Sequence, residues 1–238
     1  MYRGKSIQMI LPALNESGKI GRAVERIPRD VVDDVVVVDD GSTDGTAAEA
    51  RAAGAVVLSH ATNQGVGAAI RTGIKRAQQE SVDLCGILAG DDQDDPHEIV
   101  RLADAIIDGG CDFIQGSRYL DGGKMLNQPR SRTVMTRSYS VFFSACVRHR
   151  ITDATNGFKL FRTEVTEPMN LDQTWLNRYE LEPYLLFTAI KMGLNVREVP
   201  VTKYYPPDRT VGYTKMKATR DWWGISRPML LLALHIRK

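Results

Sequence analysis

The chain has 238 residues, of which 43% are hydrophobic and 25% are charged. Lys and Arg together number 31 and Asp and Glu together number 29, so the formal net charge is only +2. This composition excludes a disordered or fibrous chain, and the near-neutral charge predicts neither a nucleic-acid partner nor a membrane partner.

The cysteines and the apolar runs indicate the cellular compartment. Cys85, Cys111 and Cys146 are odd in number and lack metal-ligand spacing, which is typical of free thiols in a reducing, cytosolic setting. The N-terminal segment lacks the apolar core of a secretory signal. No stretch approaches the ~20 apolar residues that a membrane-spanning helix needs. We therefore expect a cytoplasmic protein.

Along the first 107 residues, short apolar runs alternate with segments of helical periodicity. The runs predict strands at residues 7–11, 35–38, 56–58 and 84–88. The intervening segments predict helices at residues 16–27, 46–53, 66–79 and 96–107. The four consecutive valines at 35–38 are typical of a strand buried in a parallel sheet. The alternation predicts an α/β fold, with a Rossmann-like, mostly parallel sheet flanked by helices.

The second half continues the pattern and ends in an amphipathic tail. Strands are predicted at residues 113–116, 157–161 and 195–201, and helices at 131–148 and 179–192. The tail at 215–238 combines basic residues with Trp222, Trp223 and a short apolar run, which suits a helix at a membrane interface. A helix packed on its own core or on a second subunit is the alternative. We expect one domain over residues 1–200, followed by a loop and tail over 201–238.

Two acidic loops follow predicted strands and indicate one shared site. Ligands of open α/β sheets bind outside the carboxyl ends of the strands, where both loops begin. The loop at 39–44 has carboxylates suited to ribose hydroxyls or a base edge, and Asp44 is a candidate helix cap. The loop at 91–95 gathers hard oxygen ligands suited to Mg²⁺ or Mn²⁺. We expect Asp95 to cap the next helix and Asp91 and Gln93 to form the metal pair.

Five short motifs occur in order along the chain. They are Pro-Ala-Leu-Asn-Glu at 12–16, Val-Asp-Asp-Gly-Ser-x-Asp-Gly at 38–45, Gly-Asp-x-Gln-x-x-Pro at 90–96, Gly-Ser-Arg-Tyr at 116–119 and Asp-x-x-x-Gly-Phe at 153–158. With these motifs the chain resembles the family 2 glycosyltransferases of the GT-A fold, and most of all the polyprenyl-phosphate and dolichyl-phosphate sugar synthases. The resemblance extends over residues 6–217 and makes residues 1–200 a GT-A catalytic domain.

The resemblance implies which residues bind a nucleotide-sugar donor. The positions that hold the base and ribose are matched by Pro12, Leu14, Glu16, Val38 and Asp40. The family often has an aromatic residue where this chain has Leu14. The family's usual Asp-x-Asp falls on Ala89, Gly90 and Asp91, so the first carboxylate is missing here. Asp91 and Gln93 match the positions that contact the metal and the diphosphate.

The resemblance also implies a set of basic catalytic side chains. Arg118 and Arg132 resemble arginines that contact the phosphate groups of donor and acceptor, and a solvated helix face is the alternative for Arg132. Arg209 and Lys215 match a pair that closes over the donor, which predicts a lid in the loop after residue 200. Fixed cations would stabilise the charge that builds on a leaving nucleoside diphosphate.

Glu180 and Glu182 fall where the family carries an acidic helix start that faces the acceptor pocket. One of them, Glu180 in the first instance, would act as the base for a hydroxyl acceptor. A phosphate acceptor is already an anion and needs no base, so a structural role at the helix start is the alternative.

Together these features imply an inverting glycosyltransferase with a divalent cation, Mg²⁺ or Mn²⁺, as cofactor. The expected acceptor is a polyprenyl phosphate, such as dolichyl or undecaprenyl phosphate. Transfer to a glycan or small-molecule hydroxyl, and a non-catalytic nucleotide-sugar-binding protein, are the alternatives. Further expectations are peripheral contact with the cytoplasmic membrane face through the tail, and a homo-oligomer or a membrane partner subunit.

The net charge of +2 hides a strong segregation. Residues 1–117 carry a net charge of −8, whereas residues 118–150 and residues 201–238 each carry +6. This segregation predicts that an acidic nucleotide and metal half faces basic segments suited to phosphates and an anionic membrane surface.

Overall fold

The computed structural model describes residues 1–206 and 220–234. The strands of the main sheet are β1 (Ile7–Ala13), β2 (Asp34–Asp39), β3 (Val56–Ser59), β4 (Leu84–Ile87), β5 (Phe113–Ser117), β7 (Lys159–Arg162) and β8 (Val196–Pro200). The helices are α1 (Ile20–Glu25), α2 (Thr46–Ala52), α3 (Val66–Gln79), α4 (Ile99–Ile107), α5 (Arg130–Val147), α6 (Leu181–Lys191) and α7 (Arg220–Ala233). Short 3₁₀ helices lie at Pro96–Glu98, Thr163–Thr166 and Thr174–Leu176.

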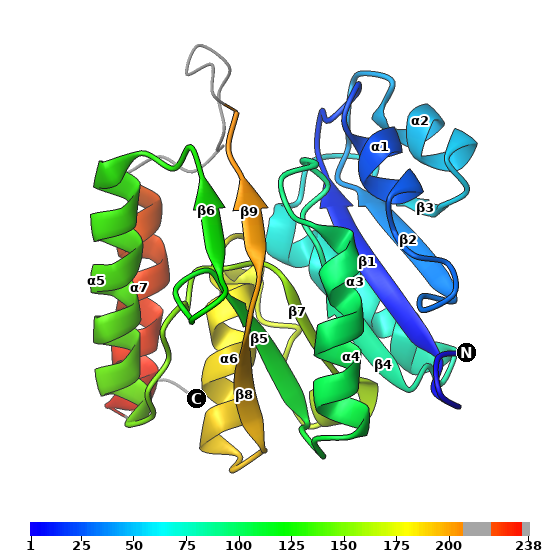
Figure 1. Cartoon of the computed structure of the whole chain (residues 1–238). Helices are drawn as coiled ribbons and strands as arrows, with labels where there is room; N and C mark the ends of the chain where they lie inside the picture. The colour runs from blue at the N-terminus through cyan, green and yellow to red at the C-terminus, as the bar shows by residue number, and fades with distance from the viewer. Residues whose placement is uncertain (207–219, 235–238) are drawn as a thin grey trace.

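The seven strands form one sheet in the order β3-β2-β1-β4-β7-β5-β8 (Figure 1). Only β7 runs antiparallel to its neighbours, and the other pairs of this sheet are parallel. Each strand and helix predicted between residues 7 and 201 is present, and most have shifted ends. The helix predicted from residue 16 begins at Ile20, because Gly18 has a φ of +80° that an α-helix does not contain. The mostly parallel α/β sheet is therefore confirmed.

The hydrophobic core lies on both faces of the sheet, because successive side chains of a strand point to opposite faces. Val35 and Val37 of β2 pack on the face that α1 and α4 cover. Val36 and Val38 pack on the opposite face, in the core that includes α3, α5 and α6. All four valines are fully buried, which explains why β2 reads as an uninterrupted apolar run rather than as an alternating one.

A second, two-stranded sheet consists of β6 (Lys124–Leu126) and β9 (Thr202–Tyr204), which run parallel. The sequence pattern predicts neither strand, because three residues are too few to show an alternation. β9 begins two residues after β8 ends, and the backbone N–H of Tyr204 donates to the carbonyl oxygen of Gln93 at 2.7 Å. This bond joins β9 to the acidic loop that follows β4.

One face of α7 packs on α5 and α6. Ile225 and Met229 are buried there, and Trp222 lies edge-on to Tyr139 with the ring centroids 5.6 Å apart. The other face leaves the large apolar side chains of Trp223 and Leu230 exposed, and Leu234, just after the helix, is exposed too. Within residues 1–206 and 220–234, no helix combines the length and apolarity needed to span a bilayer. The tail helix thus packs on its own core and still presents an apolar face. The domain boundary expected at residue 200 stays a prediction.

Candidate functional site

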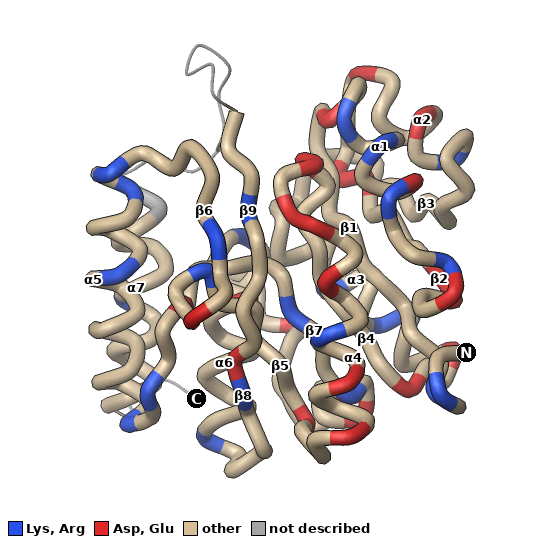
Figure 2. Tube along the Cα trace, viewed as in Figure 1, with Lys and Arg blue, Asp and Glu red and all other residues tan. Residues whose placement is uncertain are grey.

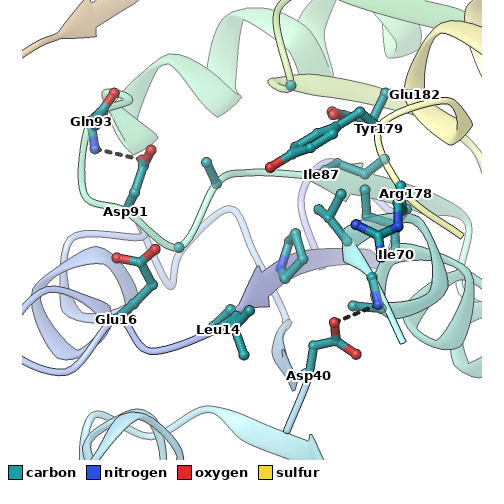
Figure 3. A pocket seen from close by; sticks show the side chains of 18 of the residues that line it. Leu14, Glu16, Asp40, Ile70, Ile87, Asp91, Gln93, Arg178, Tyr179 and Glu182 are labelled. Carbon is teal, nitrogen blue, oxygen red and sulfur yellow. Dashed lines mark hydrogen bonds between the residues drawn. The ribbon is translucent and has the colours of Figure 1, made fainter. Parts of the chain in front are cut away.

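A cavity of about 360 Å³ opens at the carboxyl ends of β1, β2 and β4 (Figure 3). Both acidic loops contribute to its wall, as the sequence predicts, because Asp40 follows β2 and Asp91 follows β4. The candidate residues that line it are Pro12, Leu14, Glu16, Asp40, Ala89, Gly90, Asp91, Gln93, Arg118 and Arg132. Val38 and Glu180 do not line it. Arg209 and Lys215 lie outside the residues that the structure describes.

Asp40 is held in the wall by the loop that leads into α3. Its carboxylate accepts hydrogen bonds from the backbone N–H groups of Gln64 at 2.9 Å and Gly65 at 2.7 Å. The Nδ1 atom of His60 lies 2.7 Å from the same carboxylate, and Nε2 lies 3.0 Å from Oγ1 of Thr72. No motif includes His60, and the structure shows that it orients Asp40. The carboxylate therefore shapes the loop at 60–65 as well as facing the cavity.

Glycine is required where this loop crosses the far wall. Gly65 has a φ of +106°, and a Cβ atom at Gly65 would lie 2.2 Å from the carbonyl oxygen of Asn177. Any side chain here would push away the segment that carries Arg178 and Tyr179. Both of these residues line the cavity opposite Leu14, and Figure 3 shows the Tyr179 ring pointing toward its centre. Sequence reasoning missed Arg178 and Tyr179, which no motif marks.

Val38 lies behind the cavity wall. Its side chain is fully buried in the core cluster with Ile10 and Ile70, and it stands beside Pro12 in the register of β1 and β2. The structure thus gives Val38 the position of a packing residue. Pro12, its partner on β1, and Leu14, just beyond the end of β1, reach the cavity.

Asp91 and Gln93 stand side by side at the other end of the cavity. The backbone N–H of Gln93 donates to Oδ1 of Asp91 at 3.2 Å, and Figure 3 shows the Glu16 carboxylate facing Asp91. Within the described residues, no three His, Cys, Asp or Glu side chains form a group that could hold a metal ion. One carboxylate and one amide oxygen nevertheless fit a hard divalent cation that completes its shell with substrate phosphates and water. The donor set suits Mg²⁺ or Mn²⁺ in a substrate complex.

The backbone of this loop depends on Gly90. A Cβ atom at Gly90 would lie 2.9 Å from Cδ1 of Ile20 and 3.1 Å from the carbonyl oxygen of Pro12. The loop can therefore pass close over the end of β1 only without a side chain at this position. Ala89, which precedes it, contributes a methyl group where the Asp-x-Asp pattern has a carboxylate.

Of the two predicted caps, Asp95 is confirmed, whereas the N-cap residue of α2 is Gly45 and Asp44 lies one residue before it; neither carboxylate lines the cavity. Oδ1 of Asp44 accepts the backbone N–H of Thr46 at 3.0 Å at the start of α2. Oδ1 of Asp95 accepts the backbone N–H of His97 at 3.2 Å in the turn that precedes α4. These bonds satisfy orphan donors at the helix starts.

Arg118 lines the cavity but is deeply anchored. Its guanidinium forms a two-point ion pair with Asp153, at 2.6 Å to Oδ2 and 2.8 Å to Oδ1. It also donates to the hydroxyl of Tyr205 and to Oγ1 of Thr155, each at 2.7 Å. Burial would raise the pKa of Asp153, but Arg118 outweighs it and holds that pKa below its usual value. Arg132 lies 5.5 Å from the centre of the Tyr205 ring, so Tyr205 contacts both arginines.

A second buried ion pair was missed by sequence reasoning. Nζ of Lys203 on β9 donates to Oδ2 of Asp94 at 2.8 Å, and Lys203 lines the cavity near Gln93. Burial alone would lower the pKa of Lys203, but the Asp94 and Asp91 carboxylates raise it above its ordinary value. Asp94 belongs to an acidic loop that the sequence marks, whereas no local pattern marks Lys203 as its partner.

The two glutamates at the start of α6 point to different places. Glu182 lines the cavity, and its Oε1 lies 3.4 Å from Nζ of the buried Lys159. Glu180 faces α7 instead, since a Cβ atom at Gly224 would lie 3.3 Å from its Oε1. The carboxylate at the cavity is therefore that of Glu182.

Helix α5 lies on the same side of the molecule as α6, and Figure 2 shows that it carries basic but no acidic residues.

The sequence family described as "Glycosyl transferase family 2" matches residues 9–169. The chain is 31% identical to the undecaprenyl-phosphate mannosyltransferase of Micrococcus luteus, over 87% of this chain and 86% of that protein. It is 30% identical to the polyprenol monophosphomannose synthase of Mycolicibacterium smegmatis, over 89% of this chain and 81% of that protein.

Among solved structures, the chain is similar to glucosyl-3-phosphoglycerate synthase of Mycobacterium tuberculosis. A complex of that protein with Mn²⁺, uridine diphosphate and glucosyl-3-phosphoglycerate has a TM-score of 0.72 and 19% sequence identity. The match covers 99% of this chain and 82% of the other. A complex with Mg²⁺ and uridine diphosphate has a TM-score of 0.71. At this identity the likeness concerns the fold.

Proposed function

The chain belongs to glycosyl transferase family 2, and from this membership we propose that it transfers a sugar from a nucleotide-sugar donor to a polyprenyl phosphate. It is a glycosyltransferase with the GT-A fold. The proposal rests on one cavity that brings together three features. They are a wall around Asp40 suited to a nucleoside, the oxygen ligands of Asp91 and Gln93, and the guanidinium groups of Arg118 and Arg132. The names of the two relatives above, which match most of this chain, support the acceptor class.

The donor would lie along the acidic wall of the cavity. Pro12, Leu14 and Asp40 would contact the base and ribose, and Glu16 lies between them and the diphosphate end. Asp91 and Gln93 would hold a divalent cation against the diphosphate. When bound, such a cation supplies positive charge that stabilises the leaving nucleoside diphosphate.

The reaction we propose is a single displacement. An oxygen of the acceptor phosphate bonds to the anomeric carbon while the bond from that carbon to the diphosphate oxygen breaks, which inverts the configuration. The protein would align the two substrates, and Arg118 and Arg132 would stabilise the leaving group. Arg209 and Lys215 are proposed to contribute further positive charge in the same step. Because the acceptor oxygen is already an anion, the step needs no protein base. Glu180 lies away from the cavity wall, which leaves Glu182 as the candidate base of the hydroxyl alternative.

The apolar face of α7 supports peripheral contact with a membrane. Trp223, Arg227 and Leu230 are exposed on one face, and a mixture of aromatic, basic and apolar side chains suits the headgroup region of a bilayer. We propose that this contact brings the cavity to lipid phosphates at the cytoplasmic face.

The proposal is tested by incubating the purified chain with UDP-sugars or GDP-mannose, a divalent cation and undecaprenyl phosphate in detergent. A glycosylated lipid phosphate, identified by mass spectrometry together with release of the nucleoside diphosphate, is expected. A parallel reaction with alkyl glycosides tests the hydroxyl alternative. Transfer to the glycoside but not to the lipid phosphate would contradict the proposed acceptor.

A further inference from the structure

Lys203 is a buried cation at the cavity with hydrogen-bonding capacity to spare. The residue is 8% exposed and lines the cavity together with Asp91 and Gln93. An ammonium group has three N–H donors, and among the described residues the only acceptor bonded to this one is Oδ2 of Asp94. The other oxygen of Asp94 accepts no hydrogen bond within the described part of the chain. Buried polar groups are nearly always hydrogen-bonded, so the two unused donors of the ammonium call for acceptors such as the oxygens of an anion, while the second oxygen of Asp94 calls for a donor.

The strand geometry places Lys203 among the phosphate-binding candidates. Lys203 and Tyr205 are two residues apart and so project from the same face of the chain as it leaves β9. Tyr205 contacts both Arg118 and Arg132, and all three basic residues line the cavity. Arg118 already uses four of its five N–H donors, on Asp153, Tyr205 and Thr155, whereas Lys203 uses one of its three, on Asp94. Lys203 therefore has more capacity left for a ligand than Arg118.

We infer that Lys203 binds a phosphate oxygen of the donor diphosphate and that Asp94 positions its ammonium for this contact. The inference rests on the proposed function. The donor phosphate is favoured over the acceptor phosphate because Lys203 is fixed to the loop that carries Asp91 and Gln93, by its ion pair and by the Tyr204 backbone bond. Because Ala89 stands where the family has a carboxylate, this loop has one acidic side chain fewer. Lys203 adds a fixed positive charge beside the remaining carboxylate, that of Asp91.

The experiment compares nucleoside diphosphate binding by isothermal titration calorimetry, with UDP and GDP, in the presence and absence of Mn²⁺. The variants are Lys203→Met, which removes the ammonium, and Asp94→Asn/Lys203→Met, which removes both charges and keeps the volume. Lys124→Met on the neighbouring strand β6 is the matched control, because Lys124 is exposed and does not line the cavity. Circular dichroism and thermal unfolding identify variants that have lost the fold.

Lys203→Met is expected to weaken diphosphate binding by about 10- to 100-fold, the usual effect of losing one hydrogen bond to a charged group. The double variant should recover thermal stability but not affinity, and Lys124→Met should bind as the wild type does. The nucleosides uridine and guanosine, which lack phosphates, should not distinguish the variants.

Three results would overturn the inference. Unchanged diphosphate affinity in folded Lys203→Met would show that Lys203 makes no such contact. Wild-type affinity in the double variant would show that Lys203 serves only to neutralise Asp94. Normal diphosphate binding with a raised KM for farnesyl phosphate would assign Lys203 to the acceptor. A wild-type chain that binds no nucleoside diphosphate would instead refute the proposed function itself, and the inference with it.

Discussion

The two walls of the cavity hold their charged side chains in different ways. On the acidic wall, the carboxylates lie in loops that directly follow β2 and β4, and Asp91 accepts a backbone N–H from only two residues along the chain. The basic side chains are held differently: Arg118 and Lys203 at the cavity, and Lys159 behind Glu182, are buried and bind carboxylates that are 35, 109 and 23 residues away in sequence.

Because of this difference, substitutions of the two kinds of charged side chain should affect different properties, ligand binding in one case and the free energy of unfolding in the other. Asp91 can be neutralised without leaving a buried charge unpaired, so its loss should affect binding more than stability, whereas Asp40 also holds the backbone N–H groups of Gln64 and Gly65. A buried ion pair behaves otherwise, because removing one partner leaves an uncompensated charge in the interior. The following substitutions test the two walls separately.

The largest effect is expected at Arg118 and Asp153. Asp153→Asn leaves the guanidinium of Arg118 buried without its carboxylate, and should lower the free energy of unfolding by about 3–5 kcal/mol. Urea denaturation followed by circular dichroism measures this change. The double variant Arg118→Met/Asp153→Asn should be more stable than Asp153→Asn alone; equal stability would contradict a charge origin.

The same pair predicts a pH dependence. Because Arg118 lowers the pKa of Asp153 in the folded state, the stabilisation is complete above the unfolded carboxyl pKa of about 3.9 and is lost as the pH falls through the lower folded value. The stability difference between wild type and Asp153→Asn should therefore stay constant from pH 8 to pH 5 and shrink below pH 4. A difference that already shrinks near neutral pH would exclude Asp153 as the titrating group.

On the acidic wall, Asp91→Asn should lower sugar transfer on the order of 100-fold, because it removes the carboxylate that would hold the cation at the leaving group. The unfolding free energy should change little. Asp92→Asn is the matched control, since Asp92 pairs with Arg22 and Arg26 and does not line the cavity. Equal losses of transfer in the two variants would contradict the assignment.

A smaller effect is expected at the start of α6. Glu182→Gln should reduce kcat/KM roughly tenfold, because the charged partner of Lys159 at the cavity is lost. Glu180→Gln should reduce it less, because Glu180 faces α7. The reverse order in steady-state assays would restore Glu180 as a catalytic base and favour a hydroxyl acceptor.

The smallest effect is expected outside the cavity, on α7. Trp223→Ala should weaken sedimentation of the chain with anionic vesicles by roughly 3- to 10-fold and leave thermal stability unchanged, since this ring is 67% exposed. Trp222→Ala serves as the comparison, because Trp222 packs on Tyr139 and should mainly affect stability. Vesicle binding that is insensitive to Trp223 would remove α7 as the membrane contact.

Much of the fold was predictable, because periodicity is a local property of the sequence. The valines of β2 and the apolar spacing of α3 each contain enough residues to show their pattern, and α3 spans the predicted range Val66–Gln79. β6 and β9 have three residues each and show none. The antiparallel direction of β7 also has no local signal, since strand direction depends on how the chain returns to the sheet.

The candidate site divides in the same way. The motifs identify Pro12, Leu14, Asp40, Asp91 and Gln93 as residues that meet in one place, and the structure brings them to one cavity. The motif context alone does not separate Val38, which packs in the core, from Asp40, which lines the cavity. The distinction requires knowledge of where β2 ends, because the strand stops at Asp39 and Asp40 lies beyond it, at the edge of the sheet.

By itself, the sequence determined the α/β sheet, the two acidic loops at the strand ends and the resemblance that identifies the family. These features depend on residues close together in the chain, where spacing is enough to predict geometry. Only the tertiary structure decided which cation neutralises which carboxylate, that Glu182 rather than Glu180 reaches the cavity, and that Lys203 lies beside Asp94. Each of these depends on segments that are distant in sequence and meet only when the sheet is assembled, because a buried charge requires a partner at hydrogen-bond distance whatever its position in the chain.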